Sequence, residues 1–229
     1  MDLSPDQSIY FCMVLTLKVA GIATLVAASM ALGLAWFMAR GRFPAKGWVD
    51  ALCALPLVLP PTVIGYCLIL LVGRRGALGS WLAEAGITLI FSWQGAVVAA
   101  TVVIFPLSYR ATRAALESVD HTLENAARTL GATEWQVLCR VSLPLAWRGI
   151  LAGISLAFAR GMGEFGATLM IAGNLPGRTQ TLALAIYDAF QAGNDEKALA
   201  LVLLTSALCV ALLLLAEGLA ARRLAASGA

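Results

Sequence analysis

The side chains that could carry chemistry in this chain are few and scattered. The one histidine, His121, and the five cysteines do not have the CxxC or HxxxH spacing of a zinc or haem site, and the cysteines suggest no disulfide framework. No residue resembles a nucleophile paired with a base, and the sequence lacks the G-x-x-x-x-G-K-S/T loop that cradles nucleotide phosphates. We therefore expect this chain to catalyse no covalent chemistry and to bind no metal or cofactor.

One charged pair lies inside an apolar stretch, where isolated charges are costly. Arg160 and Glu164 are four residues apart, so on a helix they face the same way and can form an ion pair. Two interpretations stay open: the pair fixes the helix structurally, or Arg160 lies on the route of an anion and Glu164 at a gate. A carboxylate repels an anion, so we do not expect Glu164 to bind one directly. Nearby glycines would let the helix flex or pack closely. The candidates for the pathway or its gate in this stretch are Arg160, Gly163, Glu164, Phe165 and Gly166.

The composition places these residues in a membrane. Of the 229 residues, 60% are apolar and 13% are charged, whereas a soluble domain is about half apolar and about a quarter charged. The charged residues cluster between long uncharged stretches. The net charge of +3 is therefore a poor sign of nucleic-acid binding. We predict an all-α integral membrane protein with a single transmembrane domain, residues 1–229, in contact with lipid.

Five apolar stretches are long enough to cross a bilayer as helices. When the connecting segments alternate in side, ten lysines and arginines lie on one side and four on the other. Cytoplasmic loops carry the excess, so the N-terminus is expected outside and the C-terminus in the cytoplasm. The odd number of helices in a short chain without an internal repeat predicts a homodimer. The predicted spans are residues 10–39, 51–72, 87–109, 149–173 and 198–216.

Three prolines distinguish the second of these spans. They remove backbone donors, so the helix must bend or open, and it does so either where it lines a pathway or as a kinked packing helix. Pro60 and Pro61 are the pathway candidates. Farther along the chain, the amphipathic residues 178–197 predict a short outer helix that dips into the interface and is not a sixth span.

The longest hydrophilic stretch, residues 110–148, predicts a pair of short cytoplasmic helices. Asp120 can cap the first helix, and Gly131 can supply the left-handed residue that ends it. Thr133 and Gln136 fit a capping box at the start of the second helix.

The same stretch has the features of a docking element. Two alanines on the exposed side of the first helix, Ala126 and Ala127, would let another protein approach closely. Leu143 and Pro144 are expected to break the helical run. The alternative is an amphipathic helix that lies at the membrane surface.

This stretch resembles the coupling loop of ABC importer permeases, whose pattern is E-A-A, three residues, G, nine residues and I-x-L-P. Val141 replaces the isoleucine, Asn125 stands where the pattern has Glu, and Glu124 lies one place earlier. The residues that match in spacing are Ala126, Ala127, Gly131, Leu143 and Pro144.

The resemblance implies the type I ABC importer permease fold, in which residues 118–135 form a coupling helix that seats in a groove on a separate ATPase. ATP and magnesium would then belong to that partner. The residues that this resemblance assigns to coupling are Glu124, Ala126, Ala127, Gly131, Leu143 and Pro144.

Three further stretches, residues 55–65, 161–168 and 173–181, resemble permeases for tetrahedral oxyanions, above all molybdate permeases. The resemblance runs from about residue 12 to 215. It implies two copies of this chain with two ABC ATPase subunits in the inner membrane of a bacterium, and a periplasmic molybdate-binding protein. Arg74, Arg75 and Arg178 on the outer side are then either solvated or contact this binding protein.

Two kinds of alternative stay open. A related permease could carry sulfate, thiosulfate or tungstate, because these oxyanions share the substrate class. From another class, a secondary carrier would have no use for the coupling loop. A membrane enzyme would need a cluster of His, Asp or Glu at membrane depth, whereas Glu164 has a basic neighbour on its own helix.

Overall fold

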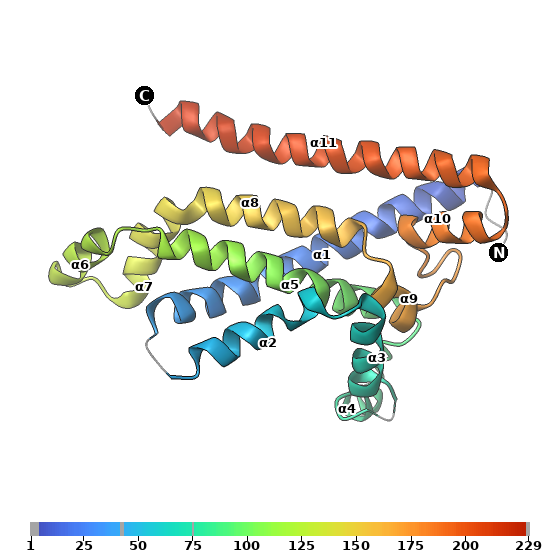
Figure 1. The fold of residues 1–229 in the computed structure, drawn as a ribbon, viewed down its shortest axis with the longest axis horizontal. Coiled ribbons are helices and arrows are strands. Elements are labelled where there is room, and N and C mark those ends of the chain that lie inside the picture. Colours follow the sequence, from blue (N-terminus) through green and yellow to red (C-terminus); the bar gives the residue numbers. More distant parts are fainter. Residues whose placement is uncertain (1–4, 42–43, 75, 228–229) are drawn as a thin grey trace.

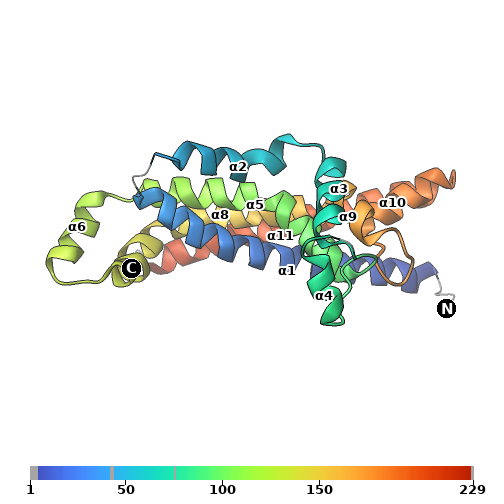
Figure 2. The same ribbon diagram turned by 90° about the horizontal axis from the view of Figure 1, so that it is seen from below.

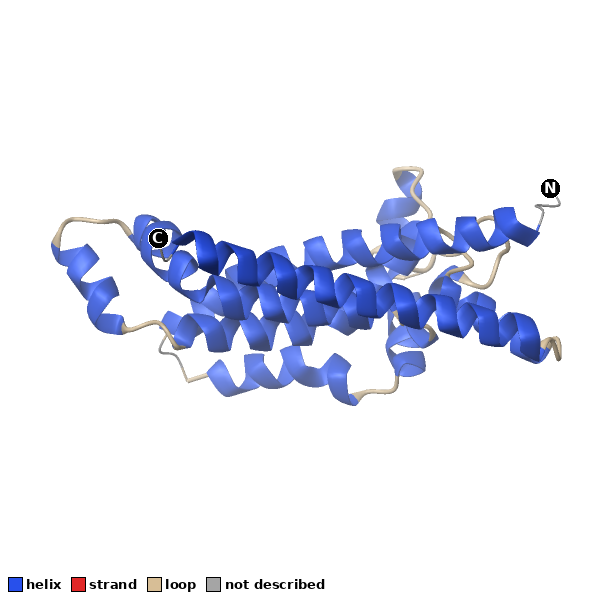
Figure 3. Ribbon diagram, turned by 90° about the horizontal axis from the view of Figure 1, so that it is seen from above, coloured by secondary structure: helices blue, strands red, loops and turns tan. Residues whose placement is uncertain are grey.

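A computed structural model describes residues 5–41, 44–74 and 76–227, and helices are its regular structure throughout these ranges (Figures 1 and 3). Four helical stretches are long and apolar enough to cross a membrane, and a bent pair of helices makes a fifth if it counts as one span. The long helices are α1 (Pro5–Arg40), α5 (Trp93–Glu117), α8 (Leu143–Met162) and α11 (Asp195–Ser227), and the bent pair is α2 (Lys46–Val58) with α3 (Pro61–Val72).

Helices α1, α5 and α8 lie side by side at the centre of the bundle (Figures 1 and 2). Small residues make this close packing possible, because between helices in lipid the attraction depends on close van der Waals contact. On α8, a Cβ atom added at Gly149 would lie 2.7 Å from the Cβ of Ala115 on α5. On α1, the completely buried alanines recur every four residues, at Ala23, Ala27, Ala31 and Ala35.

Helix α2 lies on the outside of α5 and is tied to it by a polar contact. The carboxylate of Asp50 accepts a hydrogen bond from the Tyr109 hydroxyl (2.6 Å) and forms an ion pair with Arg113. Arg113 also pairs with Glu117 one turn along α5, at 2.8 Å. One guanidinium group thus pairs with two carboxylates at one end of the bundle.

The two ends of the bundle differ. At one end project α6 (His121–Thr129) and α7 (Glu134–Val137), and at the other lie the start of α1 and the short α10 (Leu182–Gln191) (Figure 1). Helix α10 confirms the short helix expected within residues 178–197. The first and last described residues lie at opposite ends, as an odd number of crossings requires.

The second span bends, as its prolines predict. Helix α2 ends at Val58, Leu59 and Pro60 are extended, and α3 continues at an angle of 113°. The cause is local: a residue before proline is driven out of the helical region, and Pro61 can begin a helix but not continue one. Helices α3 and α4 (Gly79–Glu84) project sideways from the bundle (Figures 1 and 2).

The predicted limits of the fourth span, residues 149–173, are wrong at both ends. Residues 149–173 are not one helix, because α8 ends at Met162 and α9 (Gly166–Ala172) begins after a break. At the other end, the helix does not break at Leu143 and Pro144 as expected. A π-turn, η1 (Leu138–Ser142), leads directly into α8, which begins at Leu143. In this π-turn the Leu143 amide donates to the carbonyl of Leu138, five residues earlier. The regular α-helical hydrogen bonds are therefore already interrupted at the point where Pro144 has no N–H to donate.

The third span also differs from its predicted limits. Helix α5 begins at Trp93 instead of residue 87, because the Ser92 hydroxyl caps it by accepting a hydrogen bond from the Gly95 amide (3.1 Å). It continues past residue 109 to Glu117. The first and fifth spans are each contained within a longer helix.

Candidate functional site

The projecting end of the molecule is built by the caps that the sequence predicts. Asp120 accepts a hydrogen bond from the Thr122 amide (2.8 Å) and begins α6, and this bond lowers the pKa of Asp120. Gly131 has a φ of +85° and ends the turn after α6. Thr133 and Gln136 form both hydrogen bonds of a capping box at α7.

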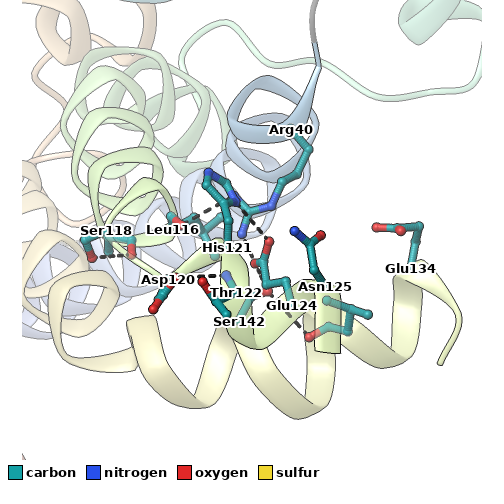
Figure 4. Close-up of polar contacts among 12 residues, drawn as sticks. Arg40, Leu116, Ser118, Asp120, His121, Thr122, Glu124, Asn125, Glu134 and Ser142 are labelled. Atoms are coloured by element: carbon teal, nitrogen blue, oxygen red, sulfur yellow. Dashed lines mark hydrogen bonds and ion pairs between the residues drawn. The ribbon is translucent and has the colours of Figure 1, made fainter. Parts of the chain in front are cut away.

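The carboxylate of Glu124 points inward from α6 and is completely buried (Figure 4). It forms an ion pair with Arg40 at the end of α1 and accepts a hydrogen bond from the Ser142 hydroxyl (2.6 Å) at the end of the π-turn. The Nδ1 atom of His121 lies 3.4 Å from the other carboxylate oxygen. Arg40 also donates to the carbonyl of Leu116 on α5 (3.4 Å).

These contacts join four parts of the chain at one carboxylate: α1, α5, α6 and the π-turn before α8. A buried carboxylate is stable only when it is paired and hydrogen-bonded, so α6 is held to the bundle by this group. The resemblance assigned Glu124 to contact with an ATPase. Its burial places it behind the outer surface of α6, as a residue that positions the helix.

Large apolar side chains are exposed among the polar residues of α6, α7 and the turn between them. Leu130 and Trp135 have 88% and 69% of their surface exposed. Ala126 is exposed, and Ala127 beside it is half-buried. Such large exposed side chains at the tip of a polar segment are typical of a surface that binds another protein. Leu143 is half-buried and Pro144 exposed at the base of this end.

A bidentate ion pair fixes the angle between α6 and α7. The guanidinium of Arg128 donates to both carboxylate oxygens of Glu134, at 2.6 and 3.0 Å. It also donates to the side-chain oxygen of Asn125 (3.0 Å), and pairing with Glu134 raises the pKa of Arg128. Asn125, which departs from the family pattern, thus supports this pair from within α6.

The two breaks in the spans meet. Helix α3, which follows Pro60, packs on α9, which follows the break after α8. A Cβ atom at Gly166 would lie 2.9 Å from the Cβ of Pro61, and one at Gly65 would lie 2.6 Å from the Cβ of Met170. Of the proline and glycine candidates, Pro61 and Gly166 therefore lie in contact, although they are about a hundred residues apart in sequence.

Glu164 acts at this site as the cap of a broken helix. Its side chain is almost completely buried, and one oxygen accepts a hydrogen bond from the Ala167 amide in the first turn of α9 (3.0 Å). The other oxygen lies 3.0 Å from Arg160, which confirms the predicted ion pair. Next to it, the Phe165 ring packs against Tyr187 of α10 with centroids 5.0 Å apart, and Gly163 is exposed.

Sequence reasoning missed the partners of Glu124. Arg40 precedes it by 84 residues, and Ser142 is brought to it by a π-turn that no local pattern announced. Arg40 was counted only as one of the basic residues that orient the chain. Arg75 lies outside the described residues. Within the described chain, no three His, Cys, Asp or Glu side chains gather as metal ligands would.

The chain is similar to molybdenum permeases over nearly its whole length. It is 48% identical over 208 residues to the molybdenum transport system permease protein ModB of Escherichia coli K12, covering 90% of this chain and 91% of that protein. The ModB protein of Haemophilus influenzae is 45% identical, with coverage of 91% and 92%. The E. coli sulfate transport system permease protein CysT is 39% identical, covering 77% of this chain and 64% of CysT.

Solved structures of ABC transporters share the fold. The methionine ABC transporter MetNI in an inward-facing conformation matches with a TM-score of 0.69 and 18% identity, covering 95% of this chain and 97% of that one. A bacterial alginate ABC transporter in complex with a periplasmic protein matches with a TM-score of 0.72 and 17% identity, covering 93% and 78%. The arrangement of helices is thus that of an ABC type I importer permease, as the sequence predicts.

A family model described as the inner membrane component of binding-protein-dependent transport systems matches residues 31–224. This match includes the projecting α6 and α7, the buried Glu124 and both helix breaks. The chain belongs to this family: it is an inner-membrane permease subunit of an ABC importer, and it is not an enzyme.

Proposed function

We propose that the chain forms the membrane pathway of a molybdate importer. The observation that supports molybdate as the substrate is the similarity to two ModB proteins, at 45–48% identity over about nine-tenths of each chain. The similarity to the sulfate permease CysT is lower and covers less of both chains. In this proposal two copies of the chain assemble with two ATPase subunits and receive molybdate from a periplasmic binding protein.

The proposed coupling runs through the end of the molecule that carries α6 and α7. ATP binding closes the two ATPases, and each coupling helix moves with the ATPase that it contacts through Leu130, Trp135 and the alanines of α6. Glu124 passes this movement to α1 and α8, because its carboxylate is bound to residues on or next to both. The excess of basic residues in the segments at this end supports a cytoplasmic location for it.

The proposed gate is the meeting point of the two helix breaks. Residues in broken helices are tolerated in a membrane where they are buried in protein or line a water-filled cavity. Because α3 and α9 are short and joined to their spans by non-helical residues, a shift of α8 relative to α2 would move them against each other. Arg160 and Glu164 neutralise each other beside this point, so the pathway is not closed to anions by an isolated carboxylate.

The test is uptake of labelled molybdate at nanomolar concentration by bacteria that lack the gene and carry it on a plasmid. We expect gene-dependent uptake that a thousandfold excess of sulfate does not reduce. Uptake abolished by sulfate would make the protein a permease of the sulfate class. Tungstate should compete with molybdate, because the two anions have the same charge and nearly the same size.

A further inference from the structure

A second site lies away from the coupling end, at the end of α3 that is opposite to its helix break. It is a cavity of about 700 Å³ between the end of α3, the short α4 and the loop before α5. Arg74 and Arg178 both line this cavity, although they come from loops that are about a hundred residues apart in sequence. The rest of its lining is largely apolar, with Val72, Ile87 and Phe91 among the residues.

The two guanidinium groups have no carboxylate to neutralise them. Of the described residues that line the cavity, none is acidic, and neither arginine forms an ion pair with a described residue. Both arginines are exposed residues at the edge of a largely apolar cavity, and low-dielectric walls focus the field of such charges on an anion. Arginine is also the side chain best suited to bind an oxyanion through two parallel hydrogen bonds.

The turn that carries Arg74 is built on glycines in close contact. The Gly76 amide bonds the Gly73 carbonyl (2.7 Å), and the Leu78 amide bonds the Leu71 carbonyl (3.0 Å). A Cβ atom at Gly79 would collide with the carbonyl oxygen of Gly73. Larger side chains at Gly76 and Gly79 would open the turn, so these contacts set where the backbone of Arg74 lies at the edge of the cavity.

The turn that carries Arg178 is equally well defined. Its sequence, Asn174 to Thr179, is one of the stretches that resemble oxyanion permeases, and the structure gives that motif a role. Gly177 has a φ of +70°, the Arg178 amide bonds the Leu175 carbonyl (3.0 Å), and the buried Thr179 hydroxyl accepts from the Leu175 amide (3.1 Å).

The wall between the two turns is strained. Phe91 has a φ of +56°, which is uncommon for a bulky residue, and its amide bonds the Ile171 carbonyl at the end of α9 (2.9 Å). A Cβ atom at Gly173 would lie 2.9 Å from the Phe91 ring. The cavity is therefore attached to α3 on one side and α9 on the other, the two helices that meet at the helix breaks.

We propose that this cavity is a binding site for a doubly charged tetrahedral oxyanion, held between Arg74 and Arg178 before it enters the pathway. Two positive charges match the two negative charges of such an ion. The inference rests on the proposed function for the identity of the transported ion. It adds a site on the permease itself, where the anion would reside between release from the binding protein and passage through the gate.

The test compares three variants that each remove one positive charge. Arg74→Gln and Arg178→Gln change the cavity, and Arg148→Gln, at an exposed residue of α8, is the control. Uptake of labelled molybdate is measured in cells, and assembly is checked by co-purification with the ATPase. We expect each cavity variant to lower uptake about tenfold or more, the effect of losing one charge-assisted hydrogen bond, and Arg148→Gln to leave it unchanged. Arg74→Lys, which keeps the charge, should recover part of the uptake.

A second measurement distinguishes an anion site from a surface that binds the binding protein. The purified complex is titrated with molybdate-loaded binding protein, and the concentration that half-maximally stimulates ATP hydrolysis is determined. An anion site predicts a value within about twofold of the unmodified complex for both cavity variants. A large increase in this concentration would mean that the arginines contact the binding protein. Unchanged uptake would mean that they bind neither the anion nor the binding protein. Each of these results overturns the inference.

The inference and the proposed function can fail separately. If the unmodified transporter carries sulfate and no molybdate, the proposed substrate is wrong, and the same variants are then measured with labelled sulfate. If it carries molybdate while the cavity variants behave like Arg148→Gln, the proposed function stands and the site does not.

Discussion

Glu124 is the residue on which the coupling end depends. Burying a charge is unfavourable unless another charge and hydrogen bonds replace the lost water. Arg40 supplies the charge, with 16% of its side chain exposed against none for Glu124, and Ser142 supplies a hydrogen bond. Because these partners sit on different elements, α6 cannot shift away from α1 without exposing or isolating the carboxylate.

Replacing Arg40 alone should therefore lower the stability of the protein more than replacing Arg40 and Glu124 together. Arg40→Gln leaves a completely buried carboxylate without its counter-charge and should cost about 3–5 kcal/mol. Glu124→Gln retains a group that Ser142 can bond and should cost less. The double variant should be more stable than Arg40→Gln alone. Thermal unfolding midpoints of the purified complex measure this order, with molybdate uptake per ATP hydrolysed as the functional quantity.

Arg110→Gln serves as the control for this series, because Arg110 is exposed and forms no ion pair with a described residue. Its midpoint should match that of the unmodified protein. A double variant as unstable as Arg40→Gln would mean that the two side chains do not stabilise each other. Unchanged uptake per ATP in Glu124→Gln would mean that the pair has a purely structural role.

At the scale of the elements, the two short helices α3 and α9 depend on glycine. Gly65 faces Met170 and Ala167 so closely that no side chain fits without displacement. Elsewhere glycine is not required: at Gly33 on α1, an added Cβ atom would meet nothing within 4 Å. The same residue type thus has a packing role in the broken helices and none at an exposed position of a straight one.

Gly65→Ala should consequently disturb the contact between α3 and α9, whereas Gly33→Ala should not. The added methyl group at Gly65 would overpack the contact and cost about 1–3 kcal/mol. At Gly33, alanine should be neutral or stabilise the helix by up to about 1 kcal/mol. We expect Gly65→Ala to lower both the uptake rate and the unfolding midpoint while assembly with the ATPase persists. Equal behaviour of the two variants would exclude a close contact between these helices.

Local sequence patterns predicted the structural features that depend on neighbouring residues, such as helix caps. They did not predict the features that depend on contacts between residues far apart in the sequence. The caps at Asp120, Gly131 and Thr133 follow from side chains within a few residues, so they could be found in the sequence. The break at residues 163–165 is stabilised by Glu164, whereas the sequence predicted for Glu164 an ion pair with Arg160 or a place at a gate and no bond to the start of a second helix. The bond between Glu124 and Arg40 depends on the packing of α6 against α1, which no periodicity contains.

At the scale of the whole molecule, the bundle has two chemically different ends. One carries the polar contacts around Glu124 and Asp50, and the exposed side chains of Leu130 after α6 and Trp135 in α7. Toward the other end lie α3, α4 and α9 (Figure 1). The helix breaks precede α3 and α9, and residues of α3, α4 and nearby loops line the cavity with Arg74 and Arg178. Transport in one direction requires such a difference, because the ATPase and the binding protein act from opposite sides of the membrane.

The orientation of these ends is the last prediction. When the connecting segments of the sequence alternate in side, the set that contains residues 110–148 has ten lysines and arginines and the other set has four, so the side that carries α6 should face the cytoplasm. The exposed native Cys139, next to α7, is a reporter for it, and Ser80→Cys, at an exposed position of α4, is a reporter for the other side. Each is placed alone in a variant without the other cysteines. A maleimide that cannot cross membranes should label Ser80→Cys in intact cells and Cys139 only after permeabilisation. The reverse pattern would place α6 and α7 outside, where no ATPase could reach them, and the proposed coupling would then be impossible.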